Sequence, residues 1–348
     1  MEQKSKILKN SIVIDVLFHD MFEDPPFECK ADYFLVDMLL NAGVNTVSTT
    51  IVADTYGEAN FIDFCHAVYL YYLFEETFPD KVKLIYKSQD IKDAKNEGKL
   101  GVILSTQGAD IVQQDLRLIT MAFKLGLRIM QITYNQNGYM GSGVFEPNDL
   151  GITRFGQQAI YEMNRLGMVI DLSHVGYKTS MDAIETSIDP VIFSHSSVKA
   201  ICKNPRNAND EQIKALAKKG GVLGLCPHSV MCTDDTSKMP DVNTFIDHMV
   251  YVGNLVGTDH IGIGTDRFVQ PTMQHLMTRR EFERTLPGFF GVYDATTKQV
   301  KGFNRFNEWE NLVENMLIRG FSDDDIEKIL GKNLIRVFET VWDKNLKK

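Results

Sequence analysis

The feature of this 348-residue chain that most limits its fold is the regular alternation of short apolar runs with helical segments. Most of the runs are continuously apolar, which is the pattern of parallel strands covered on both faces. Polar residues or glycines bound each run and mark its ends. The expected strands cover residues 11–17, 44–51, 82–86, 101–104, 127–133, 168–172, 191–193, 221–225 and 261–263.

The segments between these runs carry helix signals. Residues 153–166 place apolar side chains along one helical face, with Thr153 as the predicted N-cap and Gly167 as the predicted C-cap. Towards the C-terminus, Ser322 precedes an acidic first turn and an apolar helical stripe. Strand and helix alternating about eight times predict an α/β protein with the fold of a (β/α)₈ TIM barrel.

A doubly wound open sheet is the alternative architecture. The number of strands favours the barrel, and so does the lack of a glycine-rich phosphate loop, because "GYMGSG" at 138–143 lacks the required spacing. We therefore expect a single barrel domain over residues 1–348, with long loops after the strands and helices at the C-terminus. Residues 135–150 form one such loop and are a candidate lid.

Composition narrows the function classes. Acidic residues outnumber basic ones by 46 to 37, which argues against a nucleic-acid partner. No stretch approaches the roughly 20 apolar residues that span a bilayer, and the N-terminus lacks the apolar region of a signal peptide. The five cysteines are an odd number without paired spacing, so we expect reduced thiols and a cytoplasmic location.

Several predicted strands end in side chains that can bind a metal or move a proton. His174 and His195 each follow a serine at the end of a strand, and Asp266 follows a third strand. Because strand C-termini meet at one mouth of a barrel, these groups would suit zinc and the activation of a water. A structural reading stays open, since a single strand-end His is commonly hydrogen-bonded and Asp266 could cap a helix.

Five longer stretches carry a family resemblance. They read "GITRFGQQAIYEMNRLGMVIDLSHV", "PVIFSHSS", "NPRNANDEQIKALAKKGGVLGL", "VGTDHIGIGTD" and "FSDDDIEKILGKNLIRVFE". In this order, over about residues 11–342, the chain resembles the membrane dipeptidase (renal dipeptidase) family. The resemblance implies an amidohydrolase-like metallo-hydrolase barrel. It also implies two zinc ions bridged by a water or hydroxide that attacks the amide carbon of a dipeptide.

The resemblance also implies roles for single residues. His174 and His195 match the two histidines that bind the second zinc, and Asp266 matches the acid that handles the proton of the bridging water. Arg206 matches the arginine that binds the terminal carboxylate of the substrate, a group that a guanidinium can bind with two parallel hydrogen bonds. Asp210 is expected either to hold that loop or to meet the amino group of the substrate.

Four positions depart from the family pattern. The first strand of the family supplies a His and an Asp to the first zinc, where this chain has Leu17 and His19. Gln107 stands in place of the bridging glutamate, and a neutral amide cannot compensate two dications. Tyr134 stands in place of a substrate-facing His and can still donate a hydrogen bond to a carbonyl or oxyanion.

These departures predict a reduced metal site. One zinc on His174 and His195, helped by Asp266, Gln107 or His19, is favoured slightly over no metal, and a binuclear site comes third. The expected function is a dipeptidase-like hydrolase that cleaves a short peptide or related amide with a metal-activated water. Its catalytic residues would be Asp266 and Tyr134.

Two alternative functions remain open at this stage. A diverged member with little or no metal could act as a tailoring enzyme on a peptide-derived intermediate, or as a non-catalytic binding protein. In each case the expected ligand is small and peptide-like, contacted by Arg206, Asp210 and Tyr134. The resemblance further suggests a homodimer, with no nucleic-acid or membrane partner.

Overall fold

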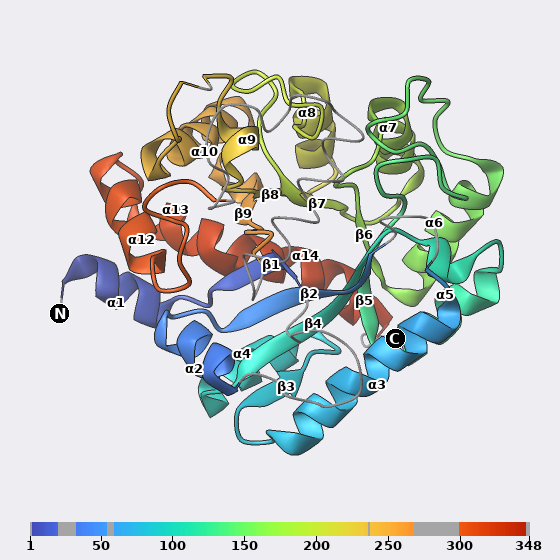
Figure 1. The fold of residues 1–348 in the computed structure, drawn as a ribbon, viewed down its shortest axis with the longest axis horizontal. Coiled ribbons are helices and arrows are strands. Elements are labelled where there is room, and N and C mark those ends of the chain that lie inside the picture. Colours follow the sequence, from blue (N-terminus) through green and yellow to red (C-terminus); the bar gives the residue numbers. More distant parts are fainter. Residues whose placement is uncertain (1, 20–32, 54–58, 236, 268–298, 346–348) are drawn as a thin grey trace.

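The computed structural model describes residues 2–19, 33–53, 59–235, 237–267 and 299–345. Within these residues, nine parallel strands form one sheet (Figure 1), and each coincides with one of the predicted apolar runs. The strands are β1 Ile14–Phe18, β2 Thr46–Ala53, β3 Val82–Leu84, β4 Leu100–Gln107, β5 Leu127–Gln131, β6 Val169–Asp171, β7 Ile192–Ser196, β8 Val222–Leu225 and β9 Ile261–Ile263.

Eight of these strands close into a barrel. The sheet runs β2-β1-β9-β8-β7-β6-β5-β4, and a further pairing of β2 with β4 joins its ends. The remaining strand, β3, pairs with residues 100–102 of β4, whereas β5 pairs with residues 104–106. The predicted TIM barrel is therefore confirmed, and the ninth apolar run is a short strand beside the ring.

Helices surround the barrel (Figure 1). Among the described residues they are α1 Gln3–Asn10, α2 Tyr33–Asn41, α3 Phe61–Thr77, α4 Ser88–Glu97, α5 Leu116–Lys124, α6 Arg154–Leu166, α7 Tyr177–Thr186, α8 Asp210–Lys218, α9 Ser229–Cys232, α10 Val242–Val256, α12 Trp309–Ile318, α13 Asp323–Glu327 and α14 Asn333–Val341, the last preceded by a π-turn at Lys328–Lys332.

The predicted helix caps are present. The Thr153 hydroxyl accepts a hydrogen bond from the Gly156 amide at the start of α6, and Gly167 ends that helix with φ 84°. Ser322 forms a capping box with Asp325 at the start of α13. A side-chain cap typically contributes about 1 kcal/mol, so these residues fix where the helices start and end.

The interior of the barrel changes from apolar to polar along the strands. The apolar layer is built from buried Ile103, Ile129, Val169 and Ile192, one from each of four strands. Side chains of a strand alternate between its two faces, so the residues two positions further on point the same way. Those residues are Ser105, Gln131, Asp171 and Ser194, all buried. A polar layer therefore lies at the C-terminal mouth.

The opposite end of the barrel is closed by α14. Leu334, Val337 and Phe338 of this helix are buried in one cluster with the interior strand residues. Asn333 donates a hydrogen bond to the Ile261 carbonyl (2.9 Å), and Trp342 donates one to the Arg128 carbonyl (3.3 Å), both at strand starts. Among the described residues, α14 therefore covers the N-terminal end of the barrel, and the polar layer lies at the C-terminal mouth.

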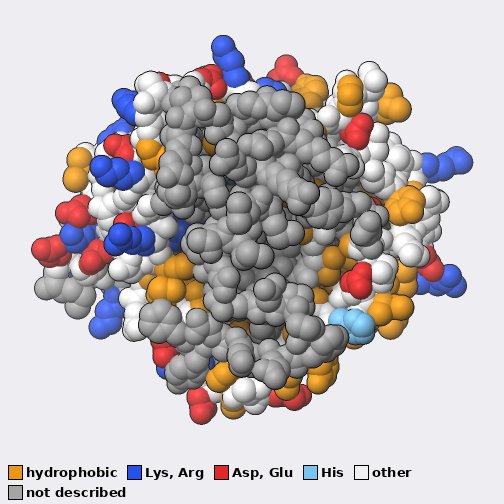
Figure 2. Space-filling model, viewed as in Figure 1, with side chains coloured by type: hydrophobic (Ala, Val, Ile, Leu, Met, Phe, Trp, Pro, Cys, Tyr) orange, Lys and Arg blue, Asp and Glu red, His pale blue; other side chains and the backbone are white. Residues whose placement is uncertain are grey.

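The face shown in Figure 2 carries acidic and basic side chains interspersed around its rim. No helix in the part of the chain that the structure describes is long and apolar enough to cross a membrane.

Candidate active site

Two imidazole rings face each other at the C-terminal mouth. His195 lies in β7, and His174 follows β6 by three residues. Their Nε2 atoms are 2.8 Å apart. His174 is 7% exposed and His195 is 1% exposed, so both rings are largely shielded from water. The structure thus brings together the two histidines that the sequence singled out.

Hydrogen bonds on the far side of each ring fix its tautomer. His174 Nδ1 lies 2.7 Å from the side-chain oxygen of Asn135, which can only accept. His195 Nδ1 lies 2.7 Å from Ser194 Oγ, whose own proton is donated to Asp171 at 2.5 Å. Both Nδ1 atoms therefore carry the proton, and both Nε2 atoms present lone pairs to each other.

This arrangement fits a bound cation. At 2.8 Å the two Nε2 atoms are within hydrogen-bonding distance, so a proton or a metal ion can lie between them. Tetrahedral zinc with Zn–N bonds of about 2.0–2.1 Å holds two nitrogens about 3.3 Å apart, so a small opening of the pair would admit a metal. Within the described ranges, no group of three or more His, Cys, Asp or Glu side chains converges as a metal site. Of the described residues, His174 and His195 are the pair whose ring nitrogens converge at this mouth.

A second pair lies at the ends of β1 and β9. His19 Nε2 is 2.8 Å from Asp266 Oδ1, and the His19 amide donates to the Arg267 carbonyl at 2.9 Å. His19 was expected as a displaced ligand helping the two histidines, and the contact that the structure gives it is with Asp266. Leu17, at the family's His position, is 1% exposed in the core. The described end of the first strand thus places the His19 ring against the Asp266 carboxylate.

Two site residues have strained backbones. His174 has φ 65° and Asp266 has φ 52°, in the left-handed region that favours glycine. Such conformations cost on the order of 1–3 kcal/mol each. The His174 carbonyl accepts from the Val144 amide at 2.7 Å, and the Asp266 amide donates to the Leu17 carbonyl at 2.9 Å. These bonds hold both side chains in orientations that an ordinary strand end would not give.

Arg206 is a buried cation beside these groups. It is 6% exposed, and its Nη2 donates to the His195 carbonyl at 3.2 Å. Burial lowers the pKa of Arg206, while the charges of Tyr134 and Asp266 oppose this shift. The Tyr134 ring stacks on His174 with centroids 4.1 Å apart. Arg206, Tyr134, Asp266 and the two histidines therefore share one region of the mouth.

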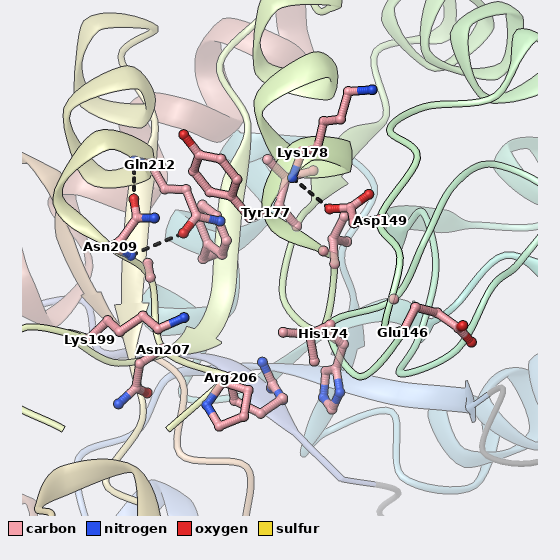
Figure 3. Close-up of a pocket in the computed structure, with 18 of the residues that line it drawn as sticks. Glu146, Asp149, His174, Tyr177, Lys178, Lys199, Arg206, Asn207, Asn209 and Gln212 are labelled. Carbon is pink, nitrogen blue, oxygen red and sulfur yellow. Dashed lines mark hydrogen bonds between the residues drawn. The ribbon is translucent and has the colours of Figure 1, made fainter. Parts of the chain in front are cut away.

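A cavity of about 300 Å³ opens beside this cluster (Figure 3). His174 and Arg206 lie at one end, and Asn209 and Gln212 of the α8 capping box lie at the other. The 135–150 loop supplies one wall: Asp149 accepts from the Lys178 amide, and the Gly176 amide donates to Ser142. The loop is thus hydrogen-bonded to the start of α7 and to His174, and its role as a lid stays a prediction.

Two predicted site residues lie to the side. Gln107, at the end of β4, is 1% exposed and donates from Nε2 to Thr50 Oγ1 at 3.0 Å. Asp210, the first residue of α8, accepts from the Tyr251 hydroxyl at 3.0 Å and does not line the cavity. This contact joins the start of α8 to α10, and the two expected roles of Asp210 stay predictions.

Comparison with known proteins shows the family to which this chain belongs. Membrane dipeptidase (peptidase family M19) matches residues 34–277 and 287–347, which is most of the chain. The chain belongs to the membrane dipeptidase family. The family resemblance predicted from the sequence is thereby confirmed, and with it the assignment to a family of hydrolases.

Relatives support the family from sequence. The dipeptidase tcpJ of Claviceps purpurea is 30% identical over 270 residues, or 77% of this chain, and the dipeptidase verJ of Clonostachys rogersoniana is 25% identical over 274 residues. The matched regions span only 57% and 63% of the length of these two proteins.

Solved structures support the fold. An amidohydrolase from Pseudomonas aeruginosa has a TM-score of 0.85 at 27% identity, covering 99% of this chain and 100% of its own. A metallo peptidase from Rhodobacter sphaeroides, solved with a phosphinate mimic of the dipeptide L-Ala-D-Ala, has a TM-score of 0.75 at 17% identity, covering 96% and 100%. At 17% identity the likeness concerns the fold alone.

Three residues of the site were not predicted from the sequence. Asn135 orients His174, while Ser194 and Asp171 orient His195. A signal for one of them was present, since both histidines follow a serine and one of these serines is the hydrogen-bond partner of a ring. Asn135 gave no such signal, because 39 residues separate it from His174.

Proposed function

We propose that this protein is a dipeptidase-like hydrolase that cleaves the amide bond of a short peptide at a site with one metal ion. The observation that carries the proposal is the pair of imidazoles whose lone pairs converge at 2.8 Å. When bound there, a zinc ion would supply Lewis acidity and lower the pKa of a coordinated water.

The chain's own groups would perform the remaining tasks. Arg206, buried and close to Tyr134 and Asp266, would bind the terminal carboxylate of the peptide. Asp266 would take a proton from the attacking water and pass it to the leaving amine as the C–O bond forms and the C–N bond breaks. His19 would orient Asp266 through their 2.8 Å contact. Tyr134 would donate a hydrogen bond to the developing oxyanion.

One observation favours a second candidate, a member that binds peptides without turning them over. Leu17 is buried in the core and cannot ligate zinc, so the first strand contributes no metal ligand at that position. A site with only two imidazole ligands holds zinc less firmly than one with three protein ligands. Retention of a peptide by the purified protein, without cleavage, would identify this candidate.

We propose a single domain, supported by the contact of Lys4 in α1 with Glu314 in α12 (2.8 Å), which joins the two ends of the described chain. A cytoplasmic location is supported by free thiols at Cys65, Cys202, Cys226 and Cys232 among the described residues. We also propose a homodimer and a small peptide substrate, supported by membership of the membrane dipeptidase family.

The test is metal analysis combined with peptide turnover. Purified protein should contain close to one zinc per chain by mass spectrometry and should hydrolyse simple dipeptides. His195→Ala should abolish both. His66→Ala, a matched change of an exposed histidine on α3, should leave both unchanged. Survival of metal content and turnover in His195→Ala would show that the site is assigned wrongly.

A further inference from the structure

Two buried aspartates make the same set of contacts at two places in the barrel. Asp171 at the end of β6 accepts from the Ser194 amide at 2.8 Å and from the Ser194 hydroxyl at 2.5 Å. Asp15 in β1 accepts from the Thr265 amide at 2.8 Å and from the Thr265 hydroxyl at 2.5 Å. Each aspartate thus accepts hydrogen bonds from a hydroxyl residue that lies directly before a site residue, Ser194 within β7 and Thr265 just after β9.

The two contacts differ in what lies beyond the hydroxyl. Ser194 Oγ lies 2.7 Å from His195 Nδ1, so Asp171, Ser194 and the ring form a chain of hydrogen bonds. Thr265 precedes Asp266 and has no histidine next to it in the sequence. The Asp171 chain therefore reaches an imidazole, whereas the Asp15 contact offers a matched comparison from the same barrel.

The direction of the Asp171 chain is fixed by its acceptor end. One oxygen of Asp171 accepts from two backbone amides, those of Ser173 at 3.0 Å and Ser194 at 2.8 Å, and the other accepts from the Ser194 hydroxyl. A hydroxyl has one proton, and Ser194 gives it to Asp171. Its oxygen can then only accept from the ring, which keeps the His195 proton on Nδ1.

We infer that Asp171 is a positioning residue that, through Ser194, fixes the tautomer of His195 and so keeps the Nε2 lone pair available for the metal. This inference rests on the proposed function, in which His195 is a metal ligand. Hydrogen bonds that orient a ligand from behind commonly change metal affinity by 10–100-fold.

The substitution Asp171→Asn should reverse the chain. The amide oxygen must stay with the two backbone N–H groups, so the new NH₂ group faces Ser194 and donates to its oxygen. The Ser194 hydroxyl then has its proton free for His195 Nδ1, and the ring proton moves to Nε2. A protonated Nε2 cannot bind metal, so zinc affinity should fall although the shape of the site is kept.

The experiment reads the tautomer and the zinc affinity separately. ¹⁵N spectra of metal-free protein labelled at its histidines, recorded well above pH 6.5, should show His195 protonated at Nδ1 in the wild type and at Nε2 in Asp171→Asn. The His195→Ala variant assigns the signal. Zinc titration against a chromophoric chelator should show a dissociation constant raised by about 10–100-fold.

Matched variants separate positioning from general loosening. Asp15→Asn makes the same change at the equivalent contact with Thr265 and should leave the His195 tautomer unchanged. Ser194→Ala should shift the His195 tautomer and weaken zinc binding, and Ser194→Thr, which keeps the hydroxyl, should restore both. If Asp171→Asn does not fold, these two variants test the inference instead. An unchanged His195 tautomer in Asp171→Asn or Ser194→Ala, or an equal tautomer change in Asp15→Asn, overturns the inference. Failure of the wild type to bind zinc would overturn the proposed metal site instead, and the metal-free spectra would still decide the role of Asp171.

Discussion

His248 should make the stability of this protein sensitive to mild acid. The residue is fully buried in α10, where its Nδ1 accepts from the Val198 amide at 3.0 Å and its Nε2 donates to the Cys232 carbonyl at 3.0 Å. Burial lowers the pKa of His248 from 6.5 to about 4, although the bond to Cys232 opposes the shift. The neutral ring is therefore the form that the fold accepts.

The magnitude follows from linkage between protonation and folding. Between pH 6.5 and 4 the unfolded chain binds a proton at His248 that the folded chain does not, so the free energy of unfolding falls as the pH falls. One unit of difference in pKa corresponds to about 1.36 kcal/mol, so a shift from 6.5 to about 4 removes about 3 kcal/mol. The full stability is present above pH 6.5 and is lost progressively on acidification.

The assay is urea unfolding at several pH values between 4 and 7.5. His248→Gln is the reference, because a glutamine can accept from Val198 and donate to Cys232 without titrating. The unfolding free energy of the wild type, minus that of the variant, should fall by about 3 kcal/mol from pH 7 to pH 4. Parallel pH profiles for the two proteins would refute the reasoning, since other titrating groups are common to both.

Two further outcomes test the site and its scaffold. Gln107→Glu should raise zinc occupancy by restoring a negative charge at the end of β4, and unchanged zinc content by mass spectrometry would mean that the missing first-strand ligands limit binding. Gly167→Ala should lower the unfolding free energy by about 1–2 kcal/mol because residue 167 has a left-handed backbone. The loss should exceed this value because a Cβ at position 167 would lie 2.7 Å from the Val341 carbonyl oxygen of α14. Equal urea midpoints for variant and wild type would contradict this expectation.

Local chemistry explains why so much of the fold was predictable. Thr153, Gly167 and Ser322 act through neighbours a few residues away, so their caps could be read from short stretches. The nine apolar runs gave the strands for the same reason. Which strands would close the ring was not readable, because the pairing of β2 with β4 that leaves β3 outside joins segments more than fifty residues apart.

The site was only half predictable for a related reason. His174 and His195 were found because strand ends converge in a barrel, a rule that needs no knowledge of side-chain partners. The contact of His19 with Asp266 joins residues more than 200 positions apart, and no local pattern predicts it. The roles of Asn135 and Asp171 likewise depend on ring nitrogens meeting specific oxygens, which only coordinates reveal.

The closure of the barrel by α14 bears on how the protein is made. All nine strands of the described residues have been synthesised by Ile263. The hydrophobic layer inside them is completed by Leu334, Val337 and Phe338, which leave the ribosome much later. Until then the strands have only part of their interior covered, and their apolar side chains stay in contact with water. Folding during translation should therefore pause at an open, aggregation-prone intermediate that the arrival of this helix resolves.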